Sequence, residues 1–111
     1  MNNNGTYLLQ ALNAIEVATG YVVGVGFTDF ENNQMMQDAV IRQLEILGES
    51  VRRLDESFIE KHRDLPFLQA ISIRNKLIHE YDDIDLEVLW ETVKNDLPVF
   101  RIQIHKLLSS I

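Results

Sequence analysis

Three side chains that could act together on a phosphodiester lie within six residues of one another: Arg74, Asn75 and His79. Arginine keeps its positive charge at every physiological pH and presents a planar fork of donors that matches phosphate oxygens. An unperturbed histidine titrates at about pH 6.5, so it can accept or donate a proton near neutrality. The combination predicts a site that neutralises charge and transfers a proton at a phosphate group.

The local pattern predicts where these side chains lie on a helix. They end an apolar-periodic segment over residues 67–78 and precede a polar run, so we expect His79 at a helix C-terminus. Asn75 and His79 are four residues apart and share a face, where the amide can hydrogen-bond the imidazole ring. Arg74 is five residues before His79, about 140° around the axis. Its side chain must bridge that gap, or the two groups must meet across a cleft between helices.

Each of these residues also has a purely structural explanation. Arg74 could form a salt bridge with one of the aspartates that follow, at positions 82, 83 and 85. His79 could be a positive charge that stabilises a helix C-terminus. The three aspartates lack the further spaced ligands of a metal site and are better explained as capping residues at a helix start. We therefore expect neither a metal nor a cofactor.

A second group of charged residues lies upstream, around Glu49. Arg42, Arg52 and Arg53 are near it in sequence, so Glu49 either holds a structural ion network or lines the cleft. Gly48 precedes it inside a helical pattern, where glycine costs about 1 kcal/mol relative to alanine. The pattern favours a role in which Gly48 lets a second helix approach closely.

The hydrophobic periodicity is helical along the whole chain, and nothing alternates with period two over a useful length. Helix signals and breakers divide the pattern into five elements. They are a first helix ending near Val23, a second from a Thr28–Glu31 capping box to about Leu54, a short segment at 55–62, a motif helix opened by Pro66, and a last helix capped by Asp85.

These elements predict an all-α fold, an up-and-down four-helix bundle with an additional short helix. Pro98 should bend the last helix, because the Lys94 carbonyl loses its hydrogen-bond donor. The chain has 111 residues, of which 46% are hydrophobic, and is too short for two cores. We therefore expect a single domain over residues 1–111.

One of the predicted helices is apolar on two faces. Along residues 28–54, a first stripe contains Val40, Leu44 and Leu47, and a second contains Met35, Ala39 and Ile46. A small domain has room to bury only one such face internally, so the second is expected to be buried against a partner subunit. The sequence therefore predicts a homodimer.

The composition limits the function classes. No cysteine is present, so the chain has no disulfide or thiol chemistry and a reducing compartment is permitted. The N-terminus lacks the basic region of a signal peptide and the longest apolar runs contain Glu16, Gly20 and Asp29, so we expect a cytoplasmic protein without membrane contact. A net charge of −7 argues against broad binding to nucleic acid. Cleavage of RNA would need a local basic patch.

The motif Arg74-x4-His79-x-Tyr81 resembles the signature of the HEPN superfamily, specifically its HepT-like toxins. The resemblance extends from about Tyr7 to Leu108 and includes four flanking segments. These are Gln37–Val40 leading into Leu44–Ser50, then Leu86–Trp90, and then Asn95–Pro98. The chain departs from the family pattern at Phe67, where Trp is expected, and at Ser50, where Ala is common. The departure at Phe67 affects packing more than chemistry, and Ser50 is a mild change.

This resemblance implies a metal-independent endoribonuclease, the toxin of a two-gene pair whose antitoxin is a minimal nucleotidyltransferase. His79 would then act as general acid or base, Arg74 would neutralise charge on the phosphorane, and Asn75 would orient the imidazole or the phosphate. The ribose 2′-hydroxyl would be the nucleophile, leaving a 2′,3′-cyclic phosphate, so RNA and not DNA is the implied substrate. The resemblance also implies that the antitoxin transfers AMP to Tyr81.

Two other functions stay open on the sequence alone. The chain could be a non-catalytic helical binding module whose motif docks a nucleotidyltransferase, or it could bind a nucleotide in the same cleft without turnover. An enzyme loses activity when His79 is replaced and keeps its fold, whereas a binding module has no nuclease activity to lose. The sequence specifies neither the RNA target nor the cleavage preference.

Overall fold

The structure is a computed structural model that describes residues 3–79 and 83–111. Its regular structure within these ranges is helical, which confirms the predicted all-α class. No helix among them is long and apolar enough to cross a lipid bilayer. The elements are α1 (Asn4–Tyr21), α2 (Phe27–Glu31), α3 (Gln34–Arg52), α4 (Glu56–Lys61), α5 (Phe67–His79), α6 (Leu86–Glu91), the π-helical segment η2 (Thr92–Asp96) and α7 (Leu97–Ser109).

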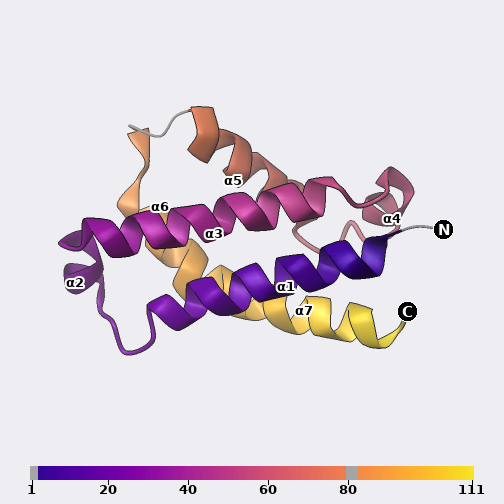
Figure 1. The fold of residues 1–111 in the computed structure, drawn as a ribbon, viewed down its shortest axis with the longest axis horizontal. Helices are drawn as coiled ribbons and strands as arrows, with labels where there is room; N and C mark the ends of the chain where they lie inside the picture. Colours follow the sequence, from indigo (N-terminus) through magenta and orange to yellow (C-terminus); the bar gives the residue numbers. More distant parts are fainter. Residues whose placement is uncertain (1–2, 80–82) are drawn as a thin grey trace.

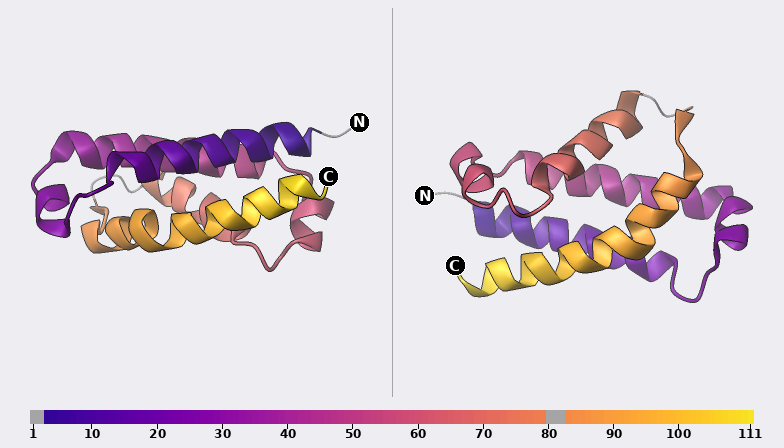
Figure 2. Two further views of the ribbon diagram at one scale, coloured as in Figure 1. Left: turned by 90° about the horizontal axis from the view of Figure 1, so that it is seen from below. Right: turned by 180° about the vertical axis from the view of Figure 1, so that it is seen from behind.

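Helix α3 lies at the centre of the arrangement. It packs along α1 on one side and against α5 on another, and α7 packs on α1 (Figure 1). The segments α6, η2 and α7 follow one another without a break and form one continuous helical rod (Figure 2). The C-terminal end of α5 projects away from the other helices (Figures 1 and 2). The motif helix is therefore held mainly by its contact with α3.

The core is built from the apolar stripes that the periodicity predicted. The first stripe of α3 is buried, with Val40 and Val51 fully enclosed, and it meets residues such as Leu8 and Ile15 from α1. Burial of such side chains stabilises the fold by about 1.5–3 kcal/mol each. Phe67, where the family pattern has Trp, is fully buried at the start of α5. Its ring packs 5.8 Å from that of Phe100 on α7, between centroids.

The predicted helix over residues 28–54 is two helices, so this prediction was wrong at its N-terminal end. Helix α2 begins without a side-chain cap after Gly26, and the Thr28–Glu31 capping box does not form. Instead Asn33 caps α3, because its side-chain oxygen accepts a hydrogen bond from the backbone N–H of Met36 at 3.0 Å. An asparagine directly before a helix is as good a cap as threonine. Here it starts α3 as a separate helix.

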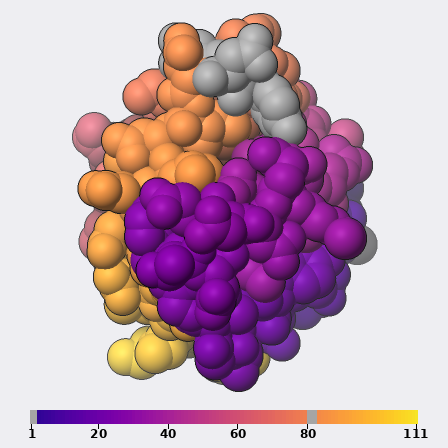
Figure 3. Space-filling view, turned by 90° about the vertical axis from the view of Figure 1, so that its left-hand side faces the viewer, coloured from indigo at the N-terminus to yellow at the C-terminus, as the bar shows by residue number. Residues whose placement is uncertain are grey.

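A buried amide and an aromatic cluster hold the break in place. The side chain of Gln37 donates from Nε2 to the carbonyls of Phe30 and Glu31 at 2.9 and 3.0 Å, which satisfies two orphan groups at the end of α2. The rings of Phe27 and Phe30 lie 6.0 and 5.1 Å from Trp90 on α6. Figure 3 shows α2 and the start of α3 covering this end of the molecule beside α6.

The other predicted helix ends agree closely with the structure. Helix α1 ends at Tyr21, two residues before the predicted Val23. Asp85 caps α6 as predicted, with its carboxylate accepting from the N–H groups of Glu87 and Val88 at 2.9 and 3.3 Å. Pro98 was predicted to bend the last helix, and the hydrogen-bond ladder widens into the π-helical segment η2 directly before α7, whose first turn contains Pro98.

The contact between α3 and α5 depends on Gly48. A Cβ atom built on Gly48 would lie 2.2 Å from the Cβ of Arg74 and 2.8 Å from the carbonyl oxygen of Ala70. No side chain fits there, so the predicted role of this glycine in close helix approach is confirmed. The same approach presses the start of the Arg74 side chain against α3.

We predict that Gly48→Ala destabilises the protein by about 1–3 kcal/mol, because the added methyl forces α5 away from α3. Gly20→Ala is the matched control, since this glycine is also helical, is exposed and has nothing within 4 Å of the place that its new methyl would occupy. That variant should gain about 0.5–1 kcal/mol through lower unfolded-state entropy. Urea unfolding of both variants measures the difference, and equal stability would contradict the prediction.

Candidate active site on helices α3 and α5

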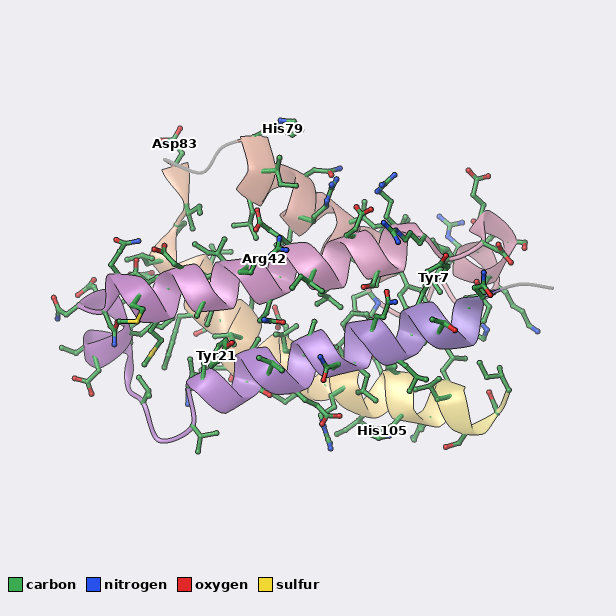
Figure 4. The ribbon with its side chains drawn as sticks, viewed as in Figure 1. Tyr7, Tyr21, Arg42, His79, Asp83 and His105 are labelled. Atoms are coloured by element: carbon green, nitrogen blue, oxygen red, sulfur yellow. The ribbon has the colours of Figure 1, made fainter. Side chains whose placement is uncertain are left out.

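Arg74, Asn75 and His79 lie on the C-terminal half of α5, and His79 is the last residue that the structure describes in that helix. Its side chain is exposed at the projecting end of the helix (Figure 4). The predicted modification residue Tyr81 lies outside the described residues. An exposed imidazole at a helix end is open to a large substrate such as a nucleic acid strand.

The side chain of Arg74 turns back toward α3. It is 25% exposed, and its Nη2 lies 3.2 Å from Oε2 of Glu49. Its Nη1 donates to the side-chain oxygen of Asn75 at 3.0 Å. The ion pair described for Arg74 is therefore with Glu49 and not with Asp83 or Asp85. Two acceptors on different helices fix the guanidinium plane and leave further N–H donors for a ligand.

Glu49 is shared by three arginines. Besides Arg74, its carboxylate accepts hydrogen bonds from Nε and Nη2 of Arg52 at 3.1 and 2.9 Å and from Nε of Arg53 at 3.3 Å. The hydrogen bond from Arg52 is the main reason that the pKa of Glu49 is lowered, and the charges of Arg52 and Arg74 add to it. The same pairing raises the pKa of Arg52. The carboxylate thus stays ionised at neutral pH.

A polar hollow of about 320 Å³ opens beside this network. Five of its nine described lining residues are charged, and the lining comes from α3, its C-cap Arg53 and α5, with one residue from α1. The described residues that line it are Gln10, Arg42, Glu45, Ile46, Glu49, Ser50, Arg53, Arg74 and Ile78. Both interpretations of Glu49 therefore hold, because it organises an ion network and lines a cleft.

Arg74 forms an ion pair with Glu49, whereas no contact between Arg74 and His79 is among the described ones. Among the described polar contacts, Arg74 is bound to Glu49 and Asn75, while His79 is displayed at the outer end of α5. The side-chain oxygen of Asn75 accepts a hydrogen bond from the guanidinium of Arg74. The predicted hydrogen bond between Asn75 and the imidazole of His79 is not among the described contacts. One chain therefore presents its fixed cation and its acid/base group on different sides of the motif helix, as the five-residue spacing predicted.

Gln10, Glu45 and Ser50 were not predicted as part of a site. Gln10 comes from α1, and no local sequence pattern connects it to α5. A signal for Glu45 and Ser50 was present, because positions 42, 45, 46, 49, 50 and 53 recur at threes and fours and so share one helix face. The hydroxyl of Ser50 donates to the carbonyl of Ile46 at 2.9 Å, which satisfies it within the helix.

Two further hollows, of about 340 and 210 Å³, are lined by residues of α3, α5 and the α6–α7 rod. Leu44, Ile73 and Thr92 line both, and most of the described lining is apolar. Arg74, Asn75 and His79 are absent from the described lining of both. In the described part of the chain no group of three or more His, Asp or Glu side chains is placed to hold a metal ion.

Comparison with known proteins identifies a family and several relatives. Residues 11–107 match the family described as Ribonuclease HepT-like. A protein of Thermococcus cleftensis named "Probable ribonuclease HepT" is 38% identical over 101 residues, which cover 91% of this chain and 92% of that protein. A protein of Caldanaerobacter subterraneus named "Putative RNase" is 35% identical over 102 residues, covering 92% and 91%.

A longer relative comes from Methanocaldococcus jannaschii and is named "Gamma-glutamylcyclotransferase and putative RNase". It is 35% identical over 105 residues, which cover 95% of this chain but 47% of that protein. The similarity therefore concerns about half of that relative. No solved structure matches the chain significantly.

Because arginines share the carboxylate of Glu49, we predict that the protein becomes less stable at acidic pH. Because the pKa of Glu49 is lower in the folded than in the unfolded protein, its stabilising contribution is complete above the unfolded value, about 4.3, and is lost as the pH falls through the folded value. Glu49→Gln should lower Tm at pH 7 by roughly 2–5 °C. The difference from wild type should shrink below about pH 4. Glu60→Gln, in an exposed pair with Arg63, is the control and should change little.

Proposed function

The chain belongs to the HepT-like ribonuclease family, and from that premise we propose that it is a metal-independent endoribonuclease that uses Arg74, Asn75 and His79. The observation that carries the proposal is the fixed guanidinium of Arg74, which Glu49 and Asn75 hold beside a polar hollow. An exposed imidazole stands five residues further along the same helix. These are the charge and the proton carrier that phosphodiester cleavage needs.

In the proposed reaction the ribose 2′-oxygen attacks the adjacent phosphorus. The 2′-oxygen–phosphorus bond forms and the bond from phosphorus to the 5′-oxygen breaks, which leaves a 2′,3′-cyclic phosphate and a 5′-hydroxyl. His79 acts as base on the 2′-hydroxyl or as acid on the leaving oxygen. Arg74 stabilises the negative charge that grows on the phosphorane, with Asn75 orienting its guanidinium. The nucleophile is part of the substrate, so the reaction needs no metal-activated water.

We also propose that the four long helical segments form an up-and-down bundle that pairs as a homodimer through the second stripe of α3 and through α5. In support, Met35 is 79% exposed and Ile78 on α5 is 44% exposed. A two-fold axis would bring two sets of Arg74 and His79 to one groove. Light scattering at micromolar concentration should give the mass of two chains, and a monodisperse monomer would contradict the pairing.

The biological role that fits this chemistry is that of a toxin acting on cytoplasmic RNA. Its antitoxin would be a minimal nucleotidyltransferase that transfers AMP from a nucleoside triphosphate to the hydroxyl of Tyr81, with release of pyrophosphate. Tyr81 is two residues from His79, so the adduct would add a negative charge and a bulky nucleotide next to the reacting groups. The adduct would repel RNA phosphate, and the nuclease would be inactive.

We predict that His79→Ala and Arg74→Ala each reduce cleavage of single-stranded RNA by roughly 10²-fold or more, the usual scale for losing an acid/base or charge-stabilising group. EDTA should have no effect, and a 2′-deoxyribose at the cleaved position should block the reaction. Chain cleavage is followed on denaturing gels, with circular dichroism to establish that both variants fold. Undiminished cleavage by His79→Ala would overturn the mechanism, and a wild type without activity would favour a binding module.

We predict that co-expression with the nucleotidyltransferase partner adds AMP to the peptide containing Tyr81. Intact mass and peptide mass spectrometry should detect the adduct in wild type and not in Tyr81→Phe. The adduct should abolish RNA cleavage, whereas the unmodified Tyr81→Phe protein should remain an active nuclease. A fully neutralised complex in which Tyr81 is unmodified would mean that the partner inhibits by docking alone.

A further inference from the structure

The face of α3 that borders the polar hollow carries a row of arginines. Arg42 and Arg53 are eleven residues apart on this face, so their Cα atoms are about 16 Å apart along the helix axis. Arg74 reaches α3 between them, at Glu49. All three line the same hollow. The row is too long for one phosphate group and has the shape of a track for several.

The two outer arginines of the row have much of their surface free. The side chain of Arg42 is 70% exposed and lies 3.9 Å from Glu45, a loose contact. The side chain of Arg53 is 55% exposed and donates to Glu49 through Nε, so its two terminal nitrogens have no partner among the described contacts. A guanidinium has five N–H donors, so each can add a two-pronged contact to a phosphate without leaving its present position.

The charge of the hollow is opposite to that of the whole chain. The chain has ten Lys and Arg against seventeen Asp and Glu, whereas the described lining has three arginines against two glutamates. A concave positive surface in an acidic protein attracts an anion to that one place. The acidic remainder repels the same anion elsewhere, which favours binding at the hollow.

We propose that Arg42, Arg74 and Arg53 form a phosphate track for the RNA strand, in which Arg42 and Arg53 bind backbone phosphates on either side of the one at Arg74. This inference rests on the proposed ribonuclease function and adds the binding site for the flanking nucleotides. Glu49 holds the middle of the track, and Glu45 weakens it at one end. The track reads phosphates and not bases, so it contributes affinity without sequence preference.

The test measures binding of a fluorescent single-stranded RNA whose riboses are 2′-O-methylated. This probe keeps every phosphate and cannot be cleaved through its 2′-oxygen. Arg42→Ala and Arg53→Ala should each weaken binding roughly three- to tenfold at low salt. Each should also reduce the slope of log affinity against log salt by about 0.7, the value for one single-strand phosphate contact. Glu45→Gln should tighten binding.

Arg63→Ala is the matched control. Arg63 has a similarly exposed side chain at 66% and an i,i+3 partner in Glu60, and it does not line the hollow. Its replacement removes the same charge from the chain and should leave both the affinity and the salt slope unchanged. With natural RNA, Arg42→Ala should raise KM and leave kcat close to wild type, because Arg42 does not touch Glu49 or the motif residues in the described contacts.

The possible results distinguish failure of the phosphate track from failure of the proposed ribonuclease function. If wild type cleaves RNA and the two arginine variants bind the probe like Arg63→Ala, the track is wrong and the ribonuclease proposal stands. If Arg42 and Arg53 are needed for binding but wild type cleaves nothing, the track stands and the ribonuclease proposal fails. Ile46 belongs both to the track lining and to the proposed dimer stripe, so light scattering accompanies each variant. Weakened binding only in variants that have become monomers would overturn the track.

Discussion

The close approach of α5 to α3 at Gly48 is the contact on which the candidate site depends. Helix α5 has few neighbours other than α3, and its last turns project from the molecule. With the Cβ of Arg74 pressed onto the position that a side chain at Gly48 would fill, the guanidinium can only run along the surface of α3, where Glu49 meets it. One missing side chain therefore sets the helix distance, the direction of the arginine and its partner.

The partner of Arg74 is Glu49, a single carboxylate that pairs with three arginines. This excess of positive charge matters for the chemistry. A one-to-one salt bridge would neutralise Arg74, whereas Glu49 divides its charge over three arginines and leaves the group positive. A glutamate is already ionised at neutral pH, and the lowered pKa of Glu49 keeps its carboxylate ionised at more acidic pH as well. The network thus fixes the guanidinium without cancelling the charge that a phosphate would feel.

Local patterns were enough to predict the helical class, the buried stripe of α3, the cap at Asp85 and the position of His79 at a helix end. The failures arose where two local signals compete or where partners are distant in sequence. Both Thr28 and Asn33 are good caps, and the choice between them depends on a buried Gln37 amide that no periodicity identifies. The partner described for Arg74 is on another helix, so the nearby aspartates were the stronger local candidates, although the ion pair that forms is with Glu49 and not with Asp83 or Asp85.

The five-residue spacing between Arg74 and His79 connects the site to the proposed quaternary structure. A spacing of four would stack the two side chains on one face and allow a complete site within one chain, whereas five turns them about 140° apart. In the structure the arginine accordingly faces α3 and the imidazole is displayed at the free end of α5. A phosphate held at Arg74 then needs its proton carrier to come from another direction. In the proposed homodimer, the second copy would supply one.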